Sequence, residues 1–114
     1  MNTSYHTTTT TTTTAREVAA RRTALATAAY EEASHWLHAE SDSCHLAEQR
    51  YQRAYDAWVC ACARAGAPAD TTARDAAMTE WRACGVRLDE ATAAFRASFA
   101  AYRAACVAEV ALYA

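Results

Sequence analysis

The chain has 114 residues, of which 53% are hydrophobic, with only two glycines and one proline and a formal net charge of −2. So little glycine and proline leaves few residues for the turns of a β-fold, and the abundant alanine and arginine are strong helix formers. The composition therefore predicts a single all-α domain. Basic and acidic residues alternate without a basic patch, which argues against a nucleic-acid partner. No apolar run approaches the roughly 18 residues of a membrane span, so we expect no membrane partner.

Residues 1–14 form a polar arm that ends in eight consecutive threonines. Threonine resists helix formation because its β-branched side chain is restricted, and a low-complexity tract cannot bury an apolar face. We therefore expect the arm to be disordered or extended. It is either a tail without consequence or a segment that binds along a partner as an extended strand.

A first long helix is predicted over residues 15–65, with Thr14 as N-cap and Glu17 completing a capping box. Its apolar positions recur every three or four residues, the spacing of a packed helix: they are Val18, Leu25, Ala29, Ala33, Trp36, Cys44, Ala47, Tyr51, Tyr55, Trp58 and Cys62. Cap-type residues gather at 41–43, where the helix could break and give a three-helix protein. Because the stripe keeps its phase there, we favour one helix, straight or kinked at 41–43.

Residues 66–71 are predicted to form the turn. Gly66 suits the left-handed residue that ends a helix, and a helix cannot continue through Pro68 two residues later. Asp70 or Thr72 is the expected N-cap of the next helix, and Asp75 completes a weak capping box with Thr72.

A second helix is predicted over residues 72–113, with a heptad seam typical of long coiled-coil-like helices. The seam consists of Met78, Trp81, Gly85, Leu88, Thr92, Phe95, Phe99, Tyr102, Cys106, Glu109 and Tyr113. Residues 25–64 and 74–113 would each span roughly 60 Å as helices. Equal lengths on either side of one turn predict an antiparallel two-helix hairpin. Matching residues outward from the turn pairs Trp58 with Trp81, Tyr51 with Leu88, Cys44 with Phe95, Trp36 with Tyr102 and Leu25 with Tyr113.

A second apolar face runs along the second helix, outside this seam. Its small residues would let another helix approach closely, and a lone two-helix hairpin buries little apolar surface. We therefore expect helix-helix packing with other chains, either in a homo-oligomer or in a larger complex. The candidate interaction face is Val86, Ala93, Ala97, Ala100, Ala104 and Val107.

Acidic and histidine side chains cluster on one face of the first helix, one turn apart. This spacing occurs in metal-binding helical bundles, which is one alternative function. The candidate ligands are Glu32, His35, His38, Asp42 and His45, with Glu31 beside them. The face points away from the Trp36 stripe, and the second helix offers no matching histidine. A solvated polar face is therefore favoured, and no cofactor or metal is expected.

The five cysteines, Cys44, Cys60, Cys62, Cys84 and Cys106, are an odd number without paired spacings. Such a set suits a reducing, intracellular compartment, where cysteines serve as small apolar residues. No catalytic motif is present, so we expect no enzyme. The expected function is a non-catalytic structural or adaptor subunit.

The stretch from Ala15 to Tyr113 resembles, in length and hairpin shape, the small Trp-x-Gly proteins exported by type VII secretion. That resemblance implies an exported helical hairpin as a further alternative. The motifs of the family are missing. The turn has Gly66-Ala-Pro68 in place of Trp-x-Gly, and Tyr102 is followed four residues later by Cys106 instead of an acidic residue.

Overall fold

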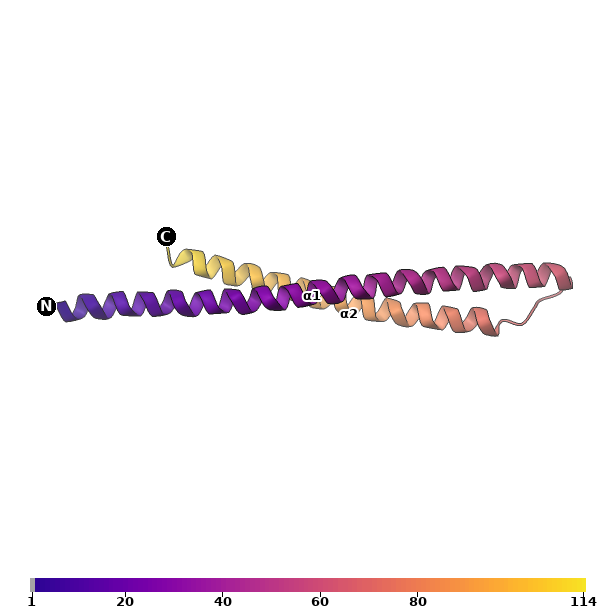
Figure 1. The fold of residues 1–114 in the computed structure, drawn as a ribbon, viewed down its shortest axis with the longest axis horizontal. Helices are drawn as coiled ribbons and strands as arrows, with labels where there is room; N and C mark the ends of the chain where they lie inside the picture. Colours follow the sequence, from indigo (N-terminus) through magenta and orange to yellow (C-terminus); the bar gives the residue numbers. More distant parts are fainter. Residues whose placement is uncertain (1) are drawn as a thin grey trace. The chain divides into compact units, whose positions relative to one another are not determined.

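The computed structural model describes residues 2–114, with the side chains of residues 12–114. It contains two helices, α1 (Asn2–Ala65) and α2 (Thr72–Ala111), and no strand within residues 2–114 (Figure 1). The predicted all-α antiparallel hairpin is confirmed. The chain divides into two compact units, to which both helices contribute. Unit 1 comprises Met1–Ser34 and Ala94–Ala114, and unit 2 comprises His35–Ala93.

The expectation of a disordered or extended arm over residues 1–14 is wrong for residues 2–14, which continue α1 as helix; Met1 lies outside the described residues. Thr14 is consequently inside the helix and not its N-cap. Extending an existing helix needs no new nucleus, and threonine is less favourable than alanine by at most about 0.7 kcal/mol per residue. Farther along α1, threonine hydroxyls donate to the carbonyl four residues earlier. Thr23 does so to Ala19 at 3.1 Å and Thr27 to Thr23 at 2.7 Å.

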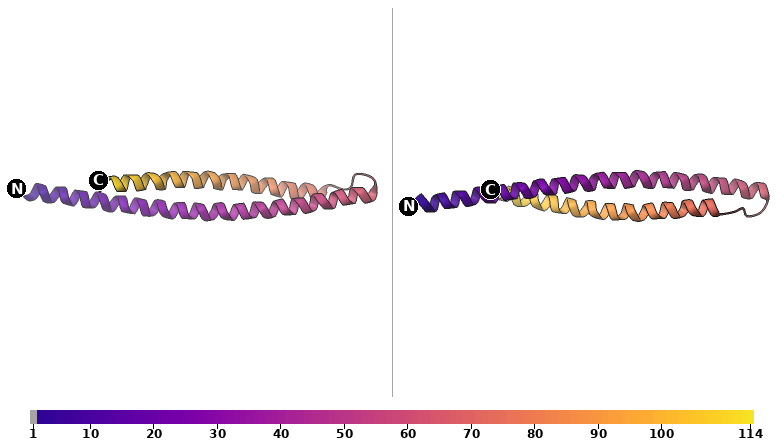
Figure 2. Two further views of the ribbon diagram at one scale, coloured as in Figure 1. Left: turned by 90° about the horizontal axis from the view of Figure 1, so that it is seen from above. Right: turned by 60° about the horizontal axis from the view of Figure 1, so that its bottom comes forward.

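In unit 2, α1 runs unbroken through residues 41–43, so the three-helix alternative is wrong. The two helices lie side by side here in both views of Figure 2. Tyr51 stacks on Trp81 at 5.3 Å between ring centroids, and Ser43 Oγ lies 3.9 Å from Cys84 Sγ. Ala47 (1% exposed), Cys84 (2%) and Ala91 (0%) form the buried centre. Because these side chains are small, the two backbones can approach closely.

In unit 1, the only residue buried among those with described side chains is Ala33. Tyr30 contributes an aromatic cluster, with its ring centroid 5.3 Å from Phe95, 5.8 Å from Phe99 and 5.5 Å from Tyr102. Farther along, Thr23 donates to the carbonyl of Ala105 at 3.3 Å. This unit is therefore held by half-buried aromatic rings and by contacts through small residues.

The turn folds as predicted between Ala65 and Thr72. Gly66 has a φ of +64°, and its N–H donates to the carbonyl of Cys62 at 3.0 Å, which ends α1 with a left-handed residue. The following segment then runs back beside the last turns of α1 before α2 begins (Figure 1). The indole of Trp58 donates to the carbonyl of Ala69 at 3.2 Å, and the N–H of Ala69 donates to Cys62 Sγ at 3.2 Å.

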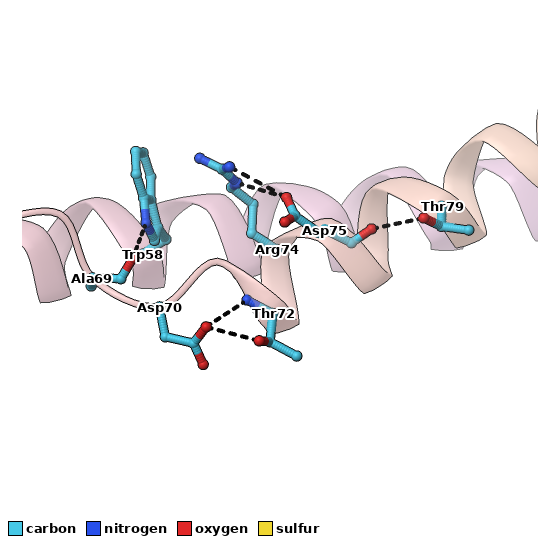
Figure 3. Close-up of polar contacts among 7 residues, drawn as sticks. All are labelled: Trp58, Ala69, Asp70, Thr72, Arg74, Asp75 and Thr79. Atoms are coloured by element: carbon cyan, nitrogen blue, oxygen red, sulfur yellow. Dashed lines mark hydrogen bonds and ion pairs between the residues drawn. The ribbon is translucent and has the colours of Figure 1, made fainter.

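Asp70, one of the two residues predicted for this role, caps α2 (Figure 3). Its Oδ1 accepts hydrogen bonds from the N–H of Thr72 at 3.2 Å and from the Thr72 hydroxyl at 2.8 Å. Asp75 lies in the first turn of α2 and pairs with Arg74 at 3.3 Å. The Arg74 guanidinium also lies 4.3 Å from the centre of the Trp58 ring. The N-terminus of α2 is thereby fixed against the end of α1.

Because residues 66–71 run back along α1, the residues of the two helices that face each other differ from those predicted. Trp81 faces Tyr51 instead of Trp58, and Phe95 faces Tyr30 instead of Cys44. The register is shifted by about two to four helical turns toward the start of α1. The prediction assumed a turn that adds no length along the helices. The bonds of Trp58 and Cys62 to Ala69 show that the segment instead occupies the surface of the last turns of α1.

The predicted core stripe of α1 is also out of phase toward its start. Leu25 (73% exposed) and Trp36 (40%) lie outside the core, whereas Tyr30 and Leu37 are half-buried. On α2 the predicted seam is half-buried apart from Phe99 (45% exposed) and Tyr113 (60%), and α2 ends at Ala111 instead of residue 113.

Candidate functional site

The outer surface of α2 in unit 1 is an exposed apolar face. Along it, small side chains recur at the three-and-four spacing of a helix-packing seam. We call this set the outer seam; it consists of Ala97, Ala100, Ala104, Val107 and Ala111, all exposed. Val107 is 64% exposed and the neighbouring Val110 68%. The inner, half-buried positions of the same stretch are Phe95, Ser98, Tyr102 and Ala105.

Two shallow, open depressions lie along the outer seam. One shallow apolar depression is lined by Phe99, Ala100, Arg103, Ala104, Val107 and Ala108. A second, adjoining it toward the end of α2, is lined by Cys106, Val107, Val110 and Ala111. Depressions between small residues, bordered by larger apolar ones, accept the side-chain ridges of another helix.

Arginine is the charged residue beside this face. Arg96 and Arg103 are exposed and lie one helical turn before Ala100 and Val107, respectively. The end of α2 carries no basic residue in its last turn. Arg16 of α1 donates to the carbonyl of Leu112 at 3.2 Å and lies 4.4 Å from the centre of the Tyr113 ring. On the side that faces α1, the C-terminal end of α2 is therefore contacted by the positively charged Arg16.

The remaining predicted interaction residues, Val86 and Ala93, belong to unit 2. Val86 is 58% exposed and Ala93 is exposed as well. All six residues of the predicted face are thus on the surface of their own unit. Val110 and Phe99 were not included in it, although the large apolar side chain of Val110 beside an alanine stripe could have been recognised.

The acidic and histidine side chains of α1 remain on its surface. Glu32 belongs to unit 1, and His35, His38, Asp42 and His45 belong to unit 2; each is exposed. His45 Nε2 lies 3.2 Å from the amide of Gln49. Among the residues with described side chains, no three of His, Cys, Asp or Glu are grouped so that they could hold a metal ion.

Polar contacts between the helices of unit 2 involve other residues. The Nε of Arg87 on α2 lies 3.4 Å from Glu40 Oε2 on α1, while its Nη2 donates to the buried Cys84 Sγ of its own helix at 2.9 Å. Arg50 pairs with Glu80, although both side chains are about half exposed. The Arg87–Glu40 and Arg50–Glu80 pairs connect α2 to α1. Ion pairs at the surface add little stability.

Among the residues with described side chains, two groups have a perturbed pKa. The hydroxyl and N–H of Thr72 bond to the Asp70 carboxylate and lower its pKa below the ordinary value. A hydrogen bond with the Cys106 thiol, together with Coulombic repulsion from that group, raises the pKa of Tyr102. The first is a helix cap and the second lies on the inner side of α2, so neither indicates a catalytic group.

All five cysteines are free thiols, with Cys84 buried, Cys60 exposed and Cys44, Cys62 and Cys106 half-buried. Within the described residues no helix is long and apolar enough to cross a lipid bilayer. Comparison with protein-family models, with curated proteins and with solved structures finds no match to this chain.

Proposed function

We propose that this protein is a non-catalytic structural or adaptor subunit that docks into an assembly by helix-helix packing. The observation that carries the proposal is the exposure of the outer seam in unit 1, with Val107 and Val110 each about two-thirds exposed. Contiguous exposed apolar surface commonly marks a site of protein contact. The three-and-four spacing of its small residues fits a helix as the contacting element.

The weak core of each unit supports the same proposal. The four buried residues of the described part are alanine and cysteine, and no large side chain is fully buried. A small helical domain normally needs a larger core, a metal, disulfides or association with another chain. No disulfide joins any of the five cysteines, so the proposed source of added stability is association with another chain.

The test is the size of the native protein in a gently prepared extract of the cells that produce it. We expect it to elute well above the 12.4 kDa of the single chain. The exposed Ala104 is the residue to change, because Ala104→Arg places a long charged side chain in the centre of the outer seam. This variant is expected to elute as the free chain.

The matched control is Ala28→Arg, which introduces the same side chain at an exposed position of α1 in the same unit. Arginine has nearly the helix propensity of alanine, so neither change should unfold the helix. The control is expected to elute with the wild type. A wild-type protein that elutes as the single chain in the extract would refute the proposed function.

A further inference from the structure

We propose that the partner of the outer seam is a second copy of this chain, packed antiparallel so that α2 contacts the partner's α2 about a twofold axis. This inference rests on the proposed function and specifies its partner. The surface concerned is Ala97, Ala100, Ala104, Val107 and Ala111 of unit 1.

The position of the seam on α2 leaves it open to such a partner. An α-helix turns through 3.6 residues, so residues two or five apart lie on nearly opposite sides. Tyr102, which stacks on Tyr30 of α1, is two residues from Ala104 and five from both Ala97 and Val107. The outer seam is therefore on the side of α2 that faces away from α1. A partner bound there leaves the contacts between α1 and α2 intact.

The seam is complementary to itself in side-chain size. In an antiparallel pairing with Ala104 opposite the partner's Val107, Ala100 is opposite the partner's Ala111. Because the twofold axis repeats each contact, Val107 of each copy packs against Ala104 of the other, once on either side of the axis. Large residues opposite small ones produce the interdigitation that close helix packing requires.

The position of Arg103 favours this register over the one shifted by a heptad. Shifting the pairing by one heptad would put Arg103 beside the partner's Arg103, and these like charges would repel. In the proposed register Arg103 instead lies alongside the partner's Val110 and the last turn of its α2. The carboxyl end of a helix carries partial negative charge, which a cation stabilises. Because α2 has no basic residue in its last turn and Arg16 meets only its inner side, the partner's arginine supplies the missing cation on the outer side.

The surface area of the chain allows for this contact. The structure exposes 8300 Å² for a mass of 12.4 kDa, whereas a folded monomer of that mass exposes about 6,100 Å². This surplus is spread over the whole chain, and it is larger than the roughly 800 Å² that each partner covers in an ordinary stable interface. Twofold pairing of two copies is also the commonest form of self-association.

The experiment is sedimentation velocity on the purified full-length chain, from low micromolar to several hundred micromolar. We expect the wild type and Ala28→Arg to sediment as a dimer, at twice the mass of the chain. Ala104→Arg is expected to raise the dissociation constant by about 30-fold or more, the effect of disrupting a central contact. Circular dichroism establishes that the variants keep the wild-type helix content.

Val107→Ala provides a second variant that cannot unfold the helix, because alanine has the higher helix propensity. It removes the valine side chains that face the partner's Ala104, and it should also raise the dissociation constant. A wild type that stays monomeric at several hundred micromolar overturns the inference. If that monomer is nevertheless part of an assembly in cell extract, the proposed function stands with a different partner. A dimer that both outer-seam variants leave unchanged places the interface elsewhere and likewise overturns the inference.

Discussion

Small side chains at the contact between α1 and α2 determine how closely the helices approach in unit 2. Ala47 and Ala91 are 1% and 0% exposed, and the thiol of Cys84 is also buried. By contrast, the aromatic rings Tyr51 and Trp81 lie half-buried at the edges of the contact. A core of this kind tolerates little increase in volume at its centre.

Replacing Ala91 with leucine should therefore destabilise unit 2. The larger side chain must push the backbones apart, and we expect Ala91→Leu to lower the free energy of unfolding by about 1–3 kcal/mol. The control is Ala83→Leu on the same helix, where the side chain is exposed and the change should stay within about 0.5 kcal/mol. Urea denaturation of both variants, followed by circular dichroism, makes the comparison. Equal stability of the two would show that the backbones are not in close contact at Ala91.

Asp70 makes the stability of the turn depend on pH. Its pKa is lowered in the folded protein by the bonds from Thr72, so the folded state binds its proton less readily than the unfolded state does. The stabilisation is therefore present above the ordinary aspartate pKa and is lost as the pH falls through the lowered value. We expect Asp70→Asn, which keeps a capping oxygen but does not titrate, to unfold with a smaller pH dependence than the wild type in this acidic range.

Thermal unfolding of the wild type and Asp70→Asn between pH 2 and pH 6 measures that difference. The control is Asp75→Asn, which removes a surface carboxylate paired with Arg74 and leaves the Asp70 cap in place. Parallel pH profiles for wild type and Asp70→Asn would show that the cap does not contribute.

At the scale of the helices, the sequence predicts the two boundaries at the turn but not the start of α1, the end of α2 or the pairing. Gly66 and Pro68 locate the end of α1, and the acidic and hydroxyl side chains after them locate the start of α2. The register depends instead on the bonds of Trp58 and Cys62 to Ala69, which draw the segment back along α1. Such contacts between side chain and loop backbone have no periodic signature, so counting residues from the turn could not reveal them.

The prediction of which face of α1 packs against α2 was wrong near the start of the helix for a different reason. Leu25 and Trp36 form one apolar row and Tyr30 and Leu37 another, and periodicity alone does not say which row faces α2. Tyr30 faces it because three aromatic rings of α2 lie within contact distance of its ring. The exposure of the residues in the predicted interaction face was easier to predict, since small residues outside the seam had to lie on the surface once the hairpin formed.

The register in unit 2 can be tested by a disulfide. Ser43 Oγ lies 3.9 Å from Cys84 Sγ, so a cysteine at position 43 is close enough to bond with Cys84 after a small adjustment. We expect Ser43→Cys, with the other four cysteines replaced by alanine, to form an intramolecular disulfide under mild oxidation. Mass spectrometry of proteolytic fragments detects the cross-link. Ser41→Cys in the same background is the control, because its side chain is exposed and should remain reduced.

At the scale of the whole molecule, we infer that stability comes from association as well as from the hairpin. The described part buries only three alanines and one cysteine, and twelve large apolar side chains remain exposed. A folded state that binds a second copy is stabilised by mass action, and its melting temperature then depends on protein concentration. A self-sufficient monomer has no such dependence.

The most direct test of this account is the melting temperature of the purified chain over a 100-fold range of concentration. We predict that it rises with concentration for the wild type and for Ala28→Arg. For Ala104→Arg we predict a lower melting temperature that does not change over the same range. A melting temperature independent of concentration in the wild type, and equal in Ala104→Arg, would contradict the account.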